Sequence, residues 1–228
     1  MSDDTGETGP WTEAQWEKMM RESDLKSARF GELLETLIDH PERDKIVARE
    51  MGWTELADMM EQNPHAGNEL CECDEADFES EDEPASSAGF SFRDEHDREM
   101  QQIPAYVACE RAAHAIDDVL EPYQRRESAI DETTGELIGE AYIGMHIACA
   151  KISGGHAMGY DDDVLGGNIV NNKRALEGAR QSIEAFECLR KTRLIPDKVV
   201  DRLLPLMREA EAALEARIAE LRGKMWWA

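Results

Sequence analysis

Residues 154–172, GGHAMGYDDDVLGGNIVNN, separate two long helical patterns. The stretch contains a His, a Met, a Tyr, three consecutive Asp residues, two Gly-Gly pairs and three Asn residues. Glycine is common where helices end, and Asp is common where they begin. The stretch therefore predicts a tight connection between two helices, and its polar side chains are candidates for a binding site.

Four long helical patterns surround this connection. Because the links between them are short, the predicted fold class is all-α, with an antiparallel (up-down-up-down) four-helix bundle over residues 93–228. The expected helices run from Pro104 to Leu120, from Thr133 to the Gly154-Gly155 pair, from the three aspartates to Arg193, and from Pro196 to Gly223.

Local signals place the helix ends. Pro122 should close the first helix, and Thr133 with Glu136 matches a capping box at the second. The three aspartates should cap the third helix and complement its dipole. Pro205 should bend the fourth helix.

The N-terminal part differs in composition. Residues 1–63 show three or four short helical patterns, with a capping box at Thr12 and Gln15 and a stop at Gly52. Residues 64–92 include ELCECDEADFESEDE, which has nine acids in fifteen residues. Such a segment cannot bury enough apolar surface to offset its chain entropy, so a disordered, flexible acidic linker is expected there.

The charge of the chain is strongly negative. The formal net charge is −25, from 50 acids and 25 bases. Residues 1–100 contain 29 acids and 9 bases, whereas residues 101–228 contain 21 and 16. Nucleic-acid binding and binding to anionic membranes are disfavoured, because both need a basic surface.

The compartment follows from the cysteines and from hydropathy. The five cysteines have no disulfide-framework spacing, and three fall in helical patterns, where reduced Cys packs as a small apolar residue. No stretch approaches the roughly 18 apolar residues of a membrane span, and the acidic N-terminus does not resemble a signal peptide. A cytoplasmic location is expected.

The second bundle helix is apolar nearly all round. Ile138, Met145 and Ile152 belong to the face expected in the core, while Ile143 and Ile147 lie on the reverse face. A helix of this kind needs cover on two sides. Ile143 and Ile147 are therefore a candidate interface, covered either by the N-terminal helices or by a second copy of the chain.

Known catalytic and metal motifs do not fit the sequence. A di-iron bundle needs two Glu-x-x-His motifs, and none occurs. Cys71 and Cys73, with His65 at a distance, supply too few ligands for a structural zinc site. The three aspartates lack the spacing of a calcium loop. No cofactor is expected.

The polar end of the bundle is the candidate ligand site. If the second helix continues for one more turn, His156 returns to its core-facing side. Asn168 and Asn172 lie one turn apart on the core face of the third helix, and Tyr160 lies between. These four residues could bind a small ligand, and His146 with His156 could bind a metal. The alternative is a purely structural network of satisfied hydrogen bonds.

The sequence favours a non-catalytic function. We expect a helical interaction or assembly module whose partner is another protein or a second copy in a homodimer. The second hypothesis is a bundle that binds a metal or small ligand, as an enzyme or otherwise, around His156, Asn168 and Asn172.

Overall fold

The computed structural model describes residues 9–62, 95–124 and 131–227. All regular structure in these ranges is helical, and it divides into two compact units. One unit joins residues 1–17 to residues 90–228, and the other covers residues 18–89. The linker predicted at residues 64–92 lies outside the described ranges.

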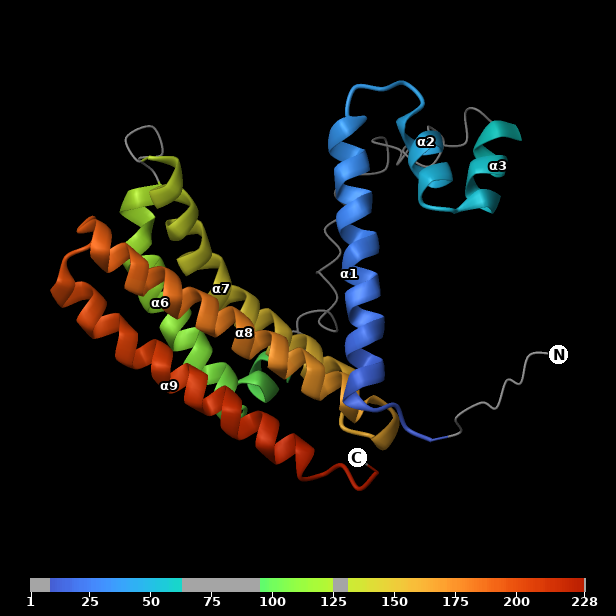
Figure 1. The fold of residues 1–228 in the computed structure, drawn as a ribbon. Helices are drawn as coiled ribbons and strands as arrows, with labels where there is room; N and C mark the ends of the chain where they lie inside the picture. The colour runs from blue at the N-terminus through green and yellow to red at the C-terminus, as the bar shows by residue number, and fades with distance from the viewer. Residues whose placement is uncertain (1–8, 63–94, 125–130, 228) are drawn as a thin grey trace, which may run out of the picture. The chain divides into compact units, whose positions relative to one another are not determined.

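Four long helices make up most of the first unit (Figure 1). Each helix packs against the next one along the chain, and the first also packs against the last, which closes the bundle. The antiparallel four-helix bundle predicted from the sequence is confirmed. The helices are α6 (Pro104–Gln124), α7 (Glu132–Met158), α8 (Asp162–Thr192) and α9 (Asp197–Arg222), and residues 95–100 form a short helical segment before them.

The core consists of the apolar faces expected from helical periodicity. Met145, Ile169 and Phe186 are fully buried. The same periodicity predicts His114 on the opposite face of α6, away from the core, and His114 is indeed exposed. Alanine supplies much of the remaining core, so neighbouring helices can approach closely. The buried alanines of the bundle are Ala105, Ala108, Ala112, Ala113, Ala141, Ala148, Ala175, Ala179, Ala185 and Ala210.

Three expected helix ends differ from the structure. Helix α6 passes Pro122 and ends at Gln124. Helix α7 begins one residue before Thr133, and its N-cap is Asp131, whose carboxylate accepts a hydrogen bond from the Thr134 N–H at 3.0 Å. The capping box at Thr133 was wrong, because Thr133 already lies inside the first turn. Asp161 occupies the N-cap of α8, but its side chain makes no capping hydrogen bond.

Helix α7 also runs through the Gly154-Gly155 pair, which was expected to end it. Gly155 is buried against α8, where a Cβ atom would lie 2.8 Å from Asn168 Oδ1. Glycine therefore permits close helix packing at this position. The helix ends instead at Gly159, whose φ of +101° is a conformation that favours glycine.

Three helices precede the bundle in the described part of the chain. Helix α1 (Glu13–Thr36) is one continuous helix of 24 residues, whereas the sequence pattern predicts two shorter helices here, over EAQWEKMM and LKSARFGELLETLID. Its capping box is confirmed: the Thr12 N–H donates to Gln15 Oε1 at 2.8 Å, and the Gln15 N–H donates to Thr12 Oγ1 at 3.4 Å. Helices α2 (Arg43–Glu50) and α3 (Thr54–Gln62) follow, and Gly52 with a φ of +75° separates them as predicted.

Helices α7 and α8 approach each other closely at two facing glycines. A Cβ atom on Gly144 would lie 2.5 Å from the carbonyl oxygen of Gly178, and one on Gly178 would lie 2.7 Å from the carbonyl oxygen of Gly144. Next to this crossing, the Ser182 hydroxyl donates a hydrogen bond to the Ala141 carbonyl. The two helix backbones are thus in direct contact, and no larger side chain fits between them.

We expect Gly144→Ala to destabilise the bundle by about 1–3 kcal/mol, because the added methyl group forces the backbones apart. The matched control is Gly135→Ala on the same helix, where a Cβ would meet nothing within 4 Å. That variant should gain about 0.5–1 kcal/mol from reduced chain entropy. Urea denaturation of both variants measures the difference. Equal stabilities would contradict the tight crossing.

Candidate functional site

Two asparagines connect the start of α8 to the end of α7. Asn168 and Asn172 are 0% and 1% exposed, so both face the core as predicted. The Asn168 side-chain amide donates to the Gly159 carbonyl at 2.8 Å, and the Asn172 amide donates to Asn168 Oδ1 at 2.9 Å. The pair thereby satisfies a carbonyl group that the end of α7 leaves without a helical partner.

A third asparagine adds to this network. The Asn171 amide donates to the sulfur of Met158 at 3.1 Å and to the Gly167 carbonyl at 3.3 Å. The Asn172 amide also reaches the Asn168 carbonyl at 3.0 Å. The three amide groups thus donate to residues at the end of α7 and the start of α8, next to the connection, whereas the buried Asn172 Oδ1 has no hydrogen-bond partner.

His156 and Tyr160 belong to a separate chain of polar contacts on the outer side of the same end. His156 Nδ1 lies 2.7 Å from the Tyr160 hydroxyl, and His156 Nε2 lies 3.0 Å from a carboxylate oxygen of Glu99. Arg217 Nη2 donates to the same hydroxyl at 2.7 Å. The chain Glu99–His156–Tyr160–Arg217 therefore joins the segment 95–100, α7, the α7–α8 connection and α9.

Two cations cover the Tyr160 ring. The guanidinium carbon of Arg217 lies 5.4 Å from the ring centroid, and Lys224 Nζ lies 5.6 Å from it. Both cations pair with Glu220, at 3.2 Å for Arg217 and 2.8 Å for Lys224. These contacts hold Tyr160 in place even though 38% of its surface is exposed.

A second histidine stands beside His156. His96, in the segment 95–100, has its ring centroid 6.1 Å from that of His156. Its Nε2 atom lies 3.0 Å from the hydroxyl of Ser153 on α7. The sequence interpretation did not include His96 or Glu99, because they lie just before the first long helical pattern and no periodicity marked them.

His146, the other predicted metal ligand, has different partners. Its Nε2 atom lies 2.8 Å from Asp117 on α6, and its ring packs 4.5 Å from the Tyr142 ring. Within the described ranges, no group of three or more His, Cys, Asp or Glu side chains could hold a metal ion. The pair Cys71 and Cys73 lies outside those ranges.

Two cysteines of the bundle, Cys109 and Cys149, are neutral thiols shielded from solvent. Burial raises the pKa of the Cys149 thiol to about 12, and burial also raises the pKa of Cys109 well above its ordinary value. Both thiols remain protonated and neutral at pH 7, and neither they nor Cys188 form a disulfide. The expectation of reduced cysteines packed within helices is confirmed for these three.

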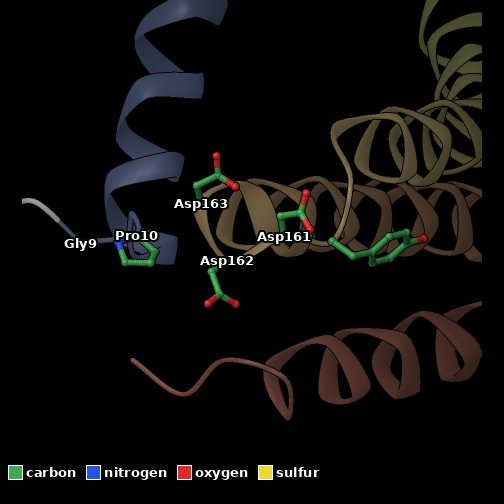
Figure 2. A pocket seen from close by; sticks show the side chains of 6 residues that line it. Gly9, Pro10, Asp161, Asp162 and Asp163 are labelled. Atoms are coloured by element: carbon green, nitrogen blue, oxygen red, sulfur yellow. The ribbon is translucent and has the colours of Figure 1, made fainter.

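The three aspartates face an open hollow beside the start of α1. Figure 2 shows Gly9 and Pro10 on one side and Asp161, Asp162 and Asp163 on the other. Asp162 accepts a hydrogen bond from the Trp226 indole N–H at 2.8 Å. The other two carboxylates are exposed to solvent, so the hollow is a solvated acidic surface.

The second Gly-Gly pair, Gly166-Gly167, packs against Trp16 at the start of α1. Cβ atoms on Gly166 and Gly167 would lie 2.7 Å and 3.0 Å from the Trp16 ring. Glu13 strengthens this contact by accepting two 2.7 Å hydrogen bonds from Arg222. These bonds, with a smaller contribution from Lys173, lower the pKa of Glu13 against the opposing effect of burial, which raises it. No local pattern in the sequence predicts that this glycine pair contacts Trp16, because the contact joins distant parts of the chain.

Comparisons with protein-family models, with curated proteins and with solved structures find no match to this chain. Among the described helices, none combines the length and the apolar character needed to cross a membrane.

We expect Asn168→Ala to cost about 1–3 kcal/mol of stability, because the Gly159 carbonyl and the Asn172 amide both lose a buried partner. Asn172→Ala should be destabilising too, and the double variant should lose less than the sum, since the two side chains bind each other. Asn171→Ala is the control, because its bond to a thioether sulfur is weak. Three variants of equal stability in urea denaturation would argue against the network.

Proposed function

We propose that this protein is a non-catalytic helical module that assembles with a second copy of itself through the outward face of α7. The supporting observation is the exposure of two large aliphatic side chains in the middle of a long, rigid helix. Ile143 is 52% exposed and Ile147 is 38% exposed.

The exposed side chains belong to a continuous stripe. Taking about 100° per residue, eight residues of α7 lie within about 40° of the direction of Ile143. Apart from the half-buried Gly139, all of them are exposed. From the N-terminal end they are Glu132, Glu136, Gly139, Ile143, Ile147, Ala150, Gly154 and Ala157.

The stripe suits a helix as its partner. Gly139, Ala150 and Gly154 place small residues around the two isoleucines, so that another helix can approach closely. Contact at this stripe would remove the isoleucines from water, at roughly 25 cal/mol per Å² of apolar surface buried. The same stripe on a second copy offers a surface of matching shape.

Charge favours an antiparallel arrangement of two copies. The N-terminal half of α7 has Glu132, Glu136 and Glu140, whereas Lys151 lies toward its C-terminal end. A two-fold axis at residue 145 would place Ile143 against Ile147 of the second copy. It would also place Lys151 almost level with Glu140 of the second copy along the helix axis, with an axial offset of one residue, about 1.5 Å. Both side chains would then lie on the same flank of the interface.

The overall acidity of the chain does not oppose this pairing strongly. Most of the excess negative charge lies in residues 1–100, while residues 101–228 have 21 acids against 16 bases. Charges beyond about 8–10 Å are largely screened at physiological salt. The acidity also makes a nucleic acid or an anionic membrane an unsuitable partner for this surface.

We expect Ile147→Glu to convert a dimer into a monomer, because the new carboxylate would be buried without a partner at the centre of the interface. Sedimentation equilibrium measures the mass. Ala212→Glu on α9 is the matched control, since Ala212 is exposed on another helix. A wild-type chain that sediments as a monomer would refute self-assembly. If the monomeric Ile147→Glu variant also melts at a lower temperature, Ile147 is covered by another part of the same chain.

A charge exchange tests the antiparallel register. Lys151→Glu and Glu140→Lys should each weaken the dimer several-fold, because each places like charges next to each other twice in a two-fold interface. The double variant should recover most of the affinity. Failure of the double variant to recover, with both single variants weakened, would contradict this register.

A further inference from the structure

We propose that the connection between α8 and α9 is a docking surface for an acidic peptide segment of another protein. The supporting observation is a group of four exposed cations that have no carboxylate partner. They lie at the end of the bundle away from the α7–α8 connection (Figure 1). Because they belong to α8, α9 and the turn between these helices, the proposal is independent of self-assembly through α7.

The charge of this connection is opposite to that of the whole chain. Residues 190–202, RKTRLIPDKVVDR, contain five bases and two acids, a net charge of +3, whereas the chain has a net charge of −25. One base and one acid cancel, because Arg190 forms an ion pair with Asp201 across the two helices. The remaining positive charge faces solvent.

Cations elsewhere on α8 and α9 have carboxylate partners. Arg180 and Arg208, for example, both bind Glu211 at 2.8 Å. At the connection, four exposed cations pair with no carboxylate of the described residues, although the chain has twice as many acids as bases. These four are Lys191, Arg193, Lys198 and Arg202.

Helix stability does not account for this arrangement. A cation in the last turn of a helix complements the helix dipole, and this explains Lys191. Lys198 lies in the first turn of α9, at the end where the dipole favours an acid instead. The position of Lys198 therefore costs stability, which favours a role for its charge outside the fold.

The spacing of the cations suits a short peptide. Lys198 and Arg202 are both exposed and lie one turn apart on α9, about 6 Å along the helix axis. Every second side chain of an extended peptide recurs at roughly 6.6 Å on the same side, so two acidic residues can reach both cations. Lys191 and Arg193 continue the positive charge across the turn.

Apolar side chains lie between the cations. Leu194 and Val199 are half-buried against the core, and Pro196 is exposed. Apolar contacts at the centre of an interface and charged groups at its rim are the usual arrangement between proteins. The connection therefore fits a peptide in which acidic residues flank an apolar one.

An acidic peptide suits this surface better than a nucleic acid does. A nucleic acid has a negative charge at every phosphate, and its binding needs an extended basic surface. The positive charge here is confined to residues 190–202, in a chain whose residues 1–100 have 29 acids against 9 bases. A short segment of a partner protein can contact the connection alone.

The experiment measures the binding of a fluorescent acidic peptide to the full chain by anisotropy. The probe has about twelve residues, with Glu at every second position and Val or Ser between them. A second probe has Gln in place of every Glu. We expect saturable binding of the Glu probe that weakens several-fold as salt is raised, and no binding of the Gln probe.

Variants of the connection test the cations. Lys198→Gln/Arg202→Gln should weaken binding of the Glu probe roughly five- to twentyfold, since each exposed ion pair contributes about two- to fivefold. Lys191→Gln/Arg193→Asn should have a similar effect. Asn is chosen at position 193 because it tolerates the φ of +59° found there.

The matched control is Lys18→Gln/Lys26→Gln, which removes the same charge from exposed positions of α1 and should bind the Glu probe as the wild type does. Circular dichroism shows that each variant is folded. The proposal is overturned if the wild type binds no Glu probe, or if the control loses as much affinity as the variants of the connection.

Two further results would overturn the choice of partner. One is a single-stranded oligonucleotide of equal charge that binds the wild type as tightly as the Glu probe. The other is binding of the Glu probe that appears only after the acids of residues 69–83 are replaced by their amides, because the chain's own acidic stretch would then be the occupant.

Discussion

The direct contact between the backbones of α7 and α8 determines most of what surrounds it. Gly144 and Gly178 meet with no room for a Cβ atom, and this crossing sets the register of the hairpin. Three turns further along, the same register places Gly155 against Asn168. The Asn168 amide then donates to the Gly159 carbonyl, which holds the end of α7 in place. Tyr160 follows directly, and its hydroxyl accepts a hydrogen bond from Arg217.

Helix α7 has two faces with different tasks. Its inner face packs against α8 and the core through small and aliphatic residues, of which Gly144 and Met145 are fully enclosed. Its outer face keeps Ile143 and Ile147 in contact with water. Because the inner face is held so closely, the outer face is a rigid platform, and a partner helix would lose little conformational entropy of α7 on binding.

Helical periodicity was sufficient to predict the bundle, the core faces and the exposure of His114 and Ile143. It was also sufficient to place Asn168 and Asn172 inward. A core-facing His156 was expected only for a helix longer than predicted; the structure has that longer helix, and His156 is half-buried between Glu99 and Tyr160. It could not identify Glu99, His96 or Arg217 as neighbours of His156, since each reaches it from a distant part of the chain. The prediction that α7 ends at Gly154-Gly155 was wrong, because glycine is common both at helix ends and where two helices pack closely.

The close crossing also has a consequence for how this chain could diverge. Along the hairpin, glycines recur eleven residues apart on each helix, at Gly144 and Gly155 on α7 and at Gly167 and Gly178 on α8. A larger residue at one of these positions would require a smaller residue opposite it on the facing helix. Substitutions at the four positions are therefore coupled. Distant homologues should therefore retain this paired spacing long after their surface residues, including the acidic ones, have changed.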